Sequence, residues 1–430
     1  MLVGLLFGSF LLLLALGMPI AHAMLPAIIV TLIVGFDIPL TVLASGLIVG
    51  IDQWIWLTMP LFLMMGNLMN ESGITDRLID LSQEIIGHIS GGLSHVGVLT
   101  NVLMAGMSGS CSADAGATGA ILIPAMKKVG YPAGYSSTLI SASSIIGPLI
   151  PPSLGLILVG AIGKQSILRL WLGGAVPGFI LGIGLIITGY FMAKKKSFPR
   201  VERRHSLKRI VRTGIVATPA LIIPVIILGG MRFGVFTPTE AGAAGVVYVL
   251  LLGTLGYRKL NFEAFTHSAL GTVALIGPLM WIIAMAILFG TVVGRLNVGP
   301  PFVDFLTGIS TNPYVFMLIV SAVVLFLGCI MEGAPIILIL YPFLKLGGAA
   351  YGIDPIHFAV LFFYLVMVGQ CTPPVGPSMF ITNAIANCSV KDYVAEGWPL
   401  LVTQFLLIFP FIFFPALITW FPDLIMGTLS

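Results

Sequence analysis

Serine residues and helix-breaking glycines and prolines lie close together in an otherwise apolar part of the sequence. Ser108 and Ser110 lie in the stretch "GMSGSCSA", and "GPLIPPS" follows at residues 147–153. Proline lacks a backbone N–H and disfavours helix in the residue before it, so the two adjacent prolines free backbone carbonyl groups. Hard cations prefer oxygen ligands, so this pattern predicts a sodium site. The expected ligands are the two hydroxyls and the carbonyls of Gly147, Pro148 and Ile150.

A related pair of stretches lies in the second half of the chain. Residues 328–335 read "GCIMEGAP" and residues 369–375 read "GQCTPPV", where Thr372 supplies a hydroxyl beside two prolines. One glycine or proline alone is most often a packing or kink residue. Two such clusters together favour binding of an ion or a substrate. The candidates for a second sodium site are Gly328, Gly369, Thr372 and Val375.

Two carboxylates accompany these clusters. Glu332 falls at the centre of the second stretch and Asp114 lies just past the first. An ionised group at membrane depth costs about 2.5–3.5 kcal/mol unless it is paired or hydrated, so a functional role is expected. A second interpretation stays open, in which each carboxylate accepts backbone N–H bonds and stiffens its own segment. The candidates for the vicinity of a substrate are Asp114, Ser153, Glu332 and Pro373.

The elements that position these residues must be membrane helices. Of 430 residues 58% are hydrophobic and 8% are charged, against about 25% charged in soluble domains. Nine of the 20 Lys and Arg residues lie between Lys194 and Arg212. The positive-inside rule places this loop in the cytoplasm. The chain is therefore expected to be a polytopic membrane protein in two halves, surrounded by lipid and with no basis for binding nucleic acid.

The two halves carry an internal repeat. A shift of 222 residues places Gly106 on Gly328, Gly147 on Gly369, and one Pro-Pro pair on the other. Counting spans outward from the basic loop makes residues 95–126 a re-entrant hairpin from the cytoplasm and residues 313–345 a hairpin from the outside. The repeat is then inverted, and both tips meet broken helices near the midplane. Such an arrangement is typical of secondary transporters.

The expected fold is all-α, with an inverted repeat, two re-entrant helical hairpins and two discontinuous helices. The hairpins and broken helices form a compact unit that can slide against flanking scaffold helices, as in an elevator. The expected divisions are scaffold helices and a connecting arm at 1–94, the first transport repeat at 95–163, scaffold helices with the basic loop at 164–312, the second transport repeat at 313–386, and a C-terminal helix at 387–430.

Other functions fit the residues less well. "GMSG" matches the pattern around the serine of rhomboid-type intramembrane proteases, but no histidine is an obvious base for Ser108, and a protease leaves the repeat unexplained. A channel is a further alternative, and Asp114 and Glu332 keep proton coupling open. The four cysteines show no CxxC or CxxH spacing, so no transition metal and no other cofactor is expected.

Five ordered motifs carry a resemblance to a known family. The run "SGSCSADAGATGAILIPAMKKVGY", then "GPLIPPS", "FTPTEA", "GIDPIHF" and "TPPVG" resemble the large membrane subunit of tripartite ATP-independent periplasmic (TRAP) transporters. The similarity covers nearly the whole chain. It implies an elevator-type importer of small organic acids in the bacterial inner membrane, driven by a sodium gradient and not an enzyme.

The resemblance also implies partners and ligands. The partners are a small four-helix membrane subunit, expected here as a separate chain, and a periplasmic solute-binding protein. Glu332 departs from the aspartate of many family members. Members carry C4-dicarboxylates, sialic acid, other hydroxy or keto acids and sulfonates, so the particular acid stays open. The family's sodium ligands fall on Ser108, Gly147, Ile150 and Pro152, and on Gly328, Gly369, Thr372 and Val375, with Ser110 added from its chemistry.

Overall fold

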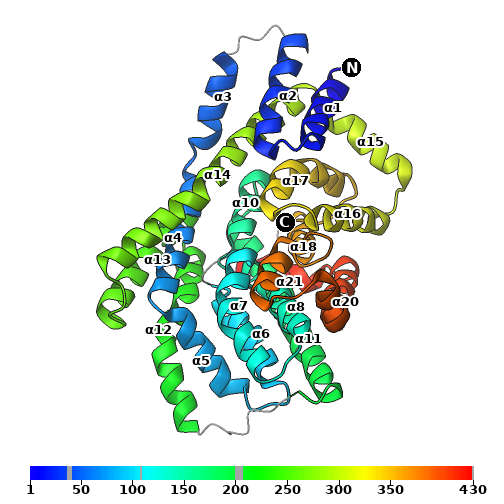
Figure 1. The fold of residues 1–430 in the computed structure, drawn as a ribbon. Coiled ribbons are helices and arrows are strands. Elements are labelled where there is room, and N and C mark those ends of the chain that lie inside the picture. The colour runs from blue at the N-terminus through cyan, green and yellow to red at the C-terminus, as the bar shows by residue number, and fades with distance from the viewer. Residues whose placement is uncertain (36–40, 107–108, 199–206, 429–430) are drawn as a thin grey trace.

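The computed structural model describes residues 1–35, 41–106, 109–198 and 207–428, and every regular element within them is a helix (Figure 1). Six of these helices are long and apolar enough to cross a membrane, and the number rises to nine when each bent pair counts as one span. Several other helices are too short to cross alone. The predicted all-α membrane fold is confirmed.

Two helical hairpins lie where the repeat predicts them. The first consists of α6 (Gly92–Met104) and α7 (Cys111–Lys128), and the second of α16 (Pro313–Gly328) and α17 (Gly333–Ala350). The helices of each hairpin contact each other. A shift of 222 residues carries both ends of α7 onto both ends of α17. The hairpins are therefore equivalent elements.

Each hairpin is followed by a broken helix. In the first half α8 (Ala133–Ser144) and α9 (Ile146–Leu149) are bent by 46° from α10 (Leu154–Gly163). In the second half α18 (Pro355–Gln370) ends before the prolines and α19 (Pro377–Ala386) follows them. Both breaks fall at the Pro-Pro pairs, as the sequence predicts.

The repeats are interlocked and do not stand apart. Helix α10 of the first half packs on α17 of the second (Figure 1). Helix α19 of the second half packs on α7 of the first. Hydroxyl groups join the same two halves, because Ser137 Oγ donates to Thr382 Oγ1 at 2.8 Å and Ser141 and Ser378 are linked at 3.1 Å. Hydrogen bonds between buried polar side chains hold this seam in one register.

A second group of helices flanks the repeats. Helix α4 (Thr58–Glu71) packs on α13 (Pro238–Leu251) and α14 (Phe262–Arg295), while α5 (Ile74–Ile86) packs on α12 (Leu207–Arg232). In Figure 1 these helices lie along one flank of the two repeats. The other helices before the C-terminal region are α1 (Leu2–Ala15), α2 (Ile20–Gly35), α3 (Thr41–Ile51), α11 (Ile167–Lys195) and α15 (Gly299–Ile309), with short 3₁₀ and π helices at Trp54–Leu57 and Leu252–Gly256.

The C-terminal region differs from the single helix expected for residues 387–430. It contains α20 (Val390–Phe413) and a separate α21 (Ala416–Met426). Proline at position 415 restricts the residue before it, and Phe414 has φ −123° and ψ 78°, outside the helical region. The helix therefore ends there, and the chain turns back across the molecule.

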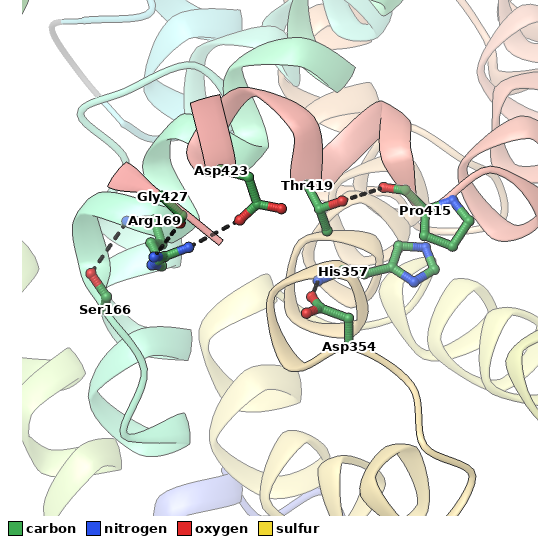
Figure 2. A network of polar contacts seen from close by, with 8 residues as sticks. All are labelled: Ser166, Arg169, Asp354, His357, Pro415, Thr419, Asp423 and Gly427. Carbon is green, nitrogen blue, oxygen red and sulfur yellow. Dashed lines mark hydrogen bonds and ion pairs between the residues drawn. The ribbon is translucent and has the colours of Figure 1, made fainter. Parts of the chain in front are cut away.

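Helix α21 is fastened to α11 through a largely buried arginine. Arg169 forms an ion pair of 3.1 Å with Asp423 and donates to the Gly427 carbonyl at 2.7 Å (Figure 2). The side chain of Arg169 is 10% exposed and that of Asp423 is 32% exposed. Hydrogen bonds that involve charged groups are the stronger ones, so this contact anchors the end of the chain.

Replacing Arg169 by alanine is expected to lower the free energy of unfolding by about 1–3 kcal/mol, because Asp423 and the Gly427 carbonyl both lose a charged donor. Thermal unfolding of the purified protein in detergent measures the effect. Arg295→Ala removes an exposed arginine at the end of α14 and serves as the matched control. Equal melting temperatures for the two variants would show that the contacts of Arg169 with Asp423 and Gly427 add no stability.

Candidate functional site

A cavity of about 530 Å³ lies where the two hairpin tips approach the flanking helices. Residues 109–113 of the first tip and 332–334 of the second line it, together with Leu154 and Gly155 at the start of α10. The rest of its wall is formed by Met59, Leu63, Gly66, Asn67 and Asn70 of α4, Leu275 and Leu279 of α14, and Pro148, Leu158, Ile337, Phe363, Met367 and Gln370 of the repeats. Its size suits a small organic ligand.

Three helices begin at this cavity. Helices α7, α10 and α17 start at Cys111, Leu154 and Gly333, and all three residues line its wall. The first turn of a helix has backbone N–H groups without helical partners and carries a partial positive charge. Three such ends facing one space favour an anion.

The residues predicted for a second sodium site lie where the second tip contacts its break. Gly328 at the tip of the second hairpin and Gly369 at the break face each other, since a Cβ on Gly369 would lie 2.6 Å from the Gly328 Cα. The Cys329 carbonyl accepts hydrogen bonds from Val375 N at 3.2 Å and from Gly376 N at 2.8 Å. Thr372 Oγ1 donates to the Val368 carbonyl at 2.7 Å. Its oxygen keeps lone pairs for a further contact.

The residues predicted for a first sodium site lie near the contact between the first tip and its break. Ser108 lies outside the described residues. The tip approaches the break through Gly109, where a Cβ would be 3.4 Å from the Pro152 carbonyl oxygen. Gly147 lies directly against the carboxylate of Asp114, which is fully buried. Ile150, beside them in the break, has an extended backbone with φ −84° and ψ 134°.

Local hydrogen bonds occupy several of the predicted site residues. Ser110 is the N-cap of α7 and accepts from Ala113 N at 3.4 Å. Ser153 is the N-cap of α10 and accepts from Leu156 N at 3.2 Å. A serine at an N-cap stabilises a helix by about 1 kcal/mol. Both hydroxyls therefore have a structural role, whatever else they contact.

The four candidates for the substrate vicinity separate into two groups. Glu332 lines the cavity, as predicted. Asp114, Ser153 and Pro373 do not line it within the described chain. Asp114 faces the break through Gly147, and Ser153 caps α10. Asp114 and Ser153 therefore contact the elements that form the wall without lining the cavity.

Four polar residues that line the cavity are not among the predicted site residues: Asn67, Asn70, Ser112 and Gln370. Asn67 and Asn70 project from α4, and Gln370 ends α18 just before the break. A signal for the asparagines exists, because two polar residues three apart in an apolar helix share a face. The signal for Gln370 is its place in "GQCTPPV", directly after Gly369 at the break.

Transition-metal chemistry finds no support in the described residues, which contain no group of three or more His, Cys, Asp or Glu side chains able to hold an ion. The cavity wall as described also contains no Lys, Arg or His. A bound anion would therefore be held by helix ends, hydroxyls and carboxamides.

Comparison with known proteins identifies the family. The family model of the tripartite ATP-independent periplasmic transporter, DctM component, matches residues 7–417. The chain belongs to this family. It is 35% identical over 428 residues, with 99% of each chain covered, to the sialic acid TRAP transporter large permease protein SiaM of Vibrio cholerae. It is 33% identical over 406 residues, covering 94% of this chain and 95% of the relative, to the 2,3-diketo-L-gulonate TRAP transporter large permease protein YiaN of Escherichia coli.

The solved structures support the fold of this permease. The YdaH transporter of Alcanivorax borkumensis, described as having an unusual topology, superimposes with a TM-score of 0.60 over 86% of each chain at 14% identity. At that identity the match concerns the fold alone. The chain is thus a multi-pass transporter permease of the inner membrane and not an enzyme, which excludes the serine protease.

The contact between Gly328 and Gly369 leads to a prediction. Gly369→Ala forces the second tip away from the break, because the added methyl would meet backbone that cannot rotate aside. Overpacking of this kind costs about 1–3 kcal/mol, and we expect transport to be lost as the cavity wall shifts. Gly290→Ala in α14 is the matched control, since its Cβ meets nothing within 4 Å. Thermal unfolding and reconstituted uptake measure both effects, and indistinguishable variants would contradict the interpretation.

Proposed function

We propose that this permease carries a small organic anion across the inner membrane, together with sodium, after receiving it from a periplasmic solute-binding protein. The observation that carries the proposal is the convergence of three helix N-termini and both hairpin tips on one cavity without a basic side chain in its described wall. Fixed helix ends hold an anion without a permanent ion pair that would slow its release.

The substrates named for two relatives agree in chemistry. SiaM is a sialic acid permease and YiaN a 2,3-diketo-L-gulonate permease, and both ligands are organic acids. A cavity of about 530 Å³ is roomy enough for acids of that size. We therefore assign a small organic acid to this chain as well.

Sodium is the proposed coupling ion. Each Pro-Pro break leaves carbonyl groups beside a hairpin tip, and Thr372 adds a hydroxyl at the second break. Oxygen-only surroundings of this kind suit a hard cation. The proposed ligands remain Ser108, Ser110, Gly147, Ile150 and Pro152 at the first break, and Gly328, Gly369, Thr372 and Val375 at the second.

The proposed membrane partner is a small subunit that packs on the flanking helices. In their most apolar segments, α12 is only 22% buried and the span Pro238–Gly256, which includes α13, only 28%. Apolar faces of this extent contact either lipid or another membrane protein. A docked subunit would widen the part of the assembly that stays still during transport.

We further propose that residues 95–163 and 313–386 move as one unit against the rest. The hydroxyl seam between α8 and α19 and the packing of α10 on α17 join these segments into one body. The cavity lies between this body and helices α4 and α14. Sliding of the whole body would then carry the bound anion across the membrane.

Uptake by proteoliposomes that contain the permease and its partners is expected to require an inward sodium gradient. Thr372→Ala should weaken apparent sodium affinity without loss of folding, because one ligand oxygen disappears and little volume is lost. Thr266→Ala is the matched control, since Thr266 makes the same bond to the carbonyl four residues earlier on an exposed face of α14. Full uptake driven by a pH gradient in sodium-free buffer would instead establish proton coupling.

Disulfide trapping tests the movement. Gly182→Cys on α11 paired with Val102→Cys on α6 joins the moving body to the rest, because a Cβ on Gly182 would lie 3.1 Å from Val102 Cγ2, and its oxidation should block uptake reversibly. Ser137→Cys paired with Thr382→Cys lies within the moving body, where the hydroxyls are 2.8 Å apart, and should leave uptake intact. Block by the second pair alone would indicate local gating within the body. The native residues Cys111, Cys329, Cys371 and Cys388 are replaced beforehand.

A further inference from the structure

The two repeats contribute different polar groups to the cavity. Positions related by the 222-residue shift carry Ser110 in the first tip and Glu332 in the second, and Pro148 in the first break and Gln370 in the second. All four residues line the cavity. The charged and carboxamide groups are therefore concentrated on the side of the second repeat.

Gln370 has the features of a ligand-binding side chain. It is 5% exposed, lines the cavity and makes no side-chain hydrogen bond to any described residue. Its Nε2 lies at the N-terminus of α17, 2.7 Å from where a Cβ of Gly333 would be. Because no described residue bonds to its carboxamide, the N–H and C=O groups of that side chain are available to a ligand in the cavity. This residue therefore points to a ligand with hydrogen-bonding groups beyond its charge.

Glu332 and Asn67 add hydrogen-bond acceptors. Glu332 is the N-cap residue of α17 and lines the cavity, and its carboxylate makes no capping bond. Asn67 Nδ2 donates to Thr272 Oγ1 at 3.0 Å and to the Ser268 carbonyl at 3.4 Å, which leaves its oxygen as an acceptor. Acceptors of this kind require O–H or N–H groups on the ligand.

We infer that the transported anion carries a single negative charge and a hydroxylated or amide-bearing arm. The inference rests on the proposed anion transport. The charge lies at the N-termini of α7 and α10, and the arm reaches Gln370, Glu332 and Asn67. Glu332 repels a second carboxylate, because no basic side chain in the described wall offsets it. An apolar arm would leave Gln370 buried without a partner.

Ligand binding to the purified permease, in complex with its membrane partner and in sodium buffer, tests this selectivity. The probes are D-gluconate, with one carboxylate and a chain of hydroxyl groups, succinate, with a second carboxylate, and hexanoate, with an apolar arm. Thermal-shift titration is expected to rank D-gluconate first. Gln370→Leu should raise the Kd for D-gluconate about tenfold, as expected for the loss of a buried hydrogen bond to ligand, and should leave hexanoate binding unchanged.

Gln53→Leu supplies the matched control, because Gln53 is an exposed carboxamide outside the cavity. Should Gln370→Leu fail to fold, Gln370→Met and the ranking of probes by the unaltered chain still decide the question. Tighter binding of succinate than of D-gluconate, or an equal effect of Gln370→Leu on all probes, overturns the selectivity while anion transport stands. No binding of any of the three acids overturns the proposed anion transport as well.

Discussion

The constraint on which this structure depends is the cost of unpaired backbone groups at membrane depth. Each such group costs several kcal/mol in lipid, so irregular backbone survives only where protein or water covers it. The two Pro-Pro breaks and the two hairpin tips are four irregular segments, and the fold places each tip against a break. The functional site therefore lies where hairpin tips and helix breaks shield each other's unpaired backbone groups from lipid.

Close approach of these segments depends on small residues. Gly328 and Gly369 bring two backbones into direct contact, and Gly109 does the same for the first tip beside Pro152 and Leu154. A Cβ at any of these positions would push a tip outward and expose the groups that it covers. The glycines thus link packing to function, because Gly109 lines the cavity itself and Gly369 directly precedes the wall residue Gln370.

Much of this organisation could be predicted from the sequence because it is local. Gly and Pro mark the tips and the breaks, and the 222-residue shift relates α7 to α17, although the predicted hairpins end at residues 126 and 345 and the helices at Lys128 and Ala350. The separation of α20 from α21 was missed, although Pro415 marks it. Gln370, Asn67 and Leu279 lie on three helices far apart in sequence. They meet only through tertiary packing. A local sequence pattern does not indicate which helices pack against each other, so this part of the site could not be predicted.

The internal symmetry of the fold explains the asymmetry of the site. The repeated backbone forms two equivalent tips and two equivalent breaks. With the same residues at equivalent positions, the two halves of the cavity would be alike. Substitutions at equivalent positions then change one half only, as Asp114 against Ile336 and Ser110 against Glu332 illustrate. The first half keeps a carboxylate behind its break, whereas the second exposes one to the cavity. A substitution at the second tip can therefore change ligand selectivity while each tip still shields the backbone groups of its break.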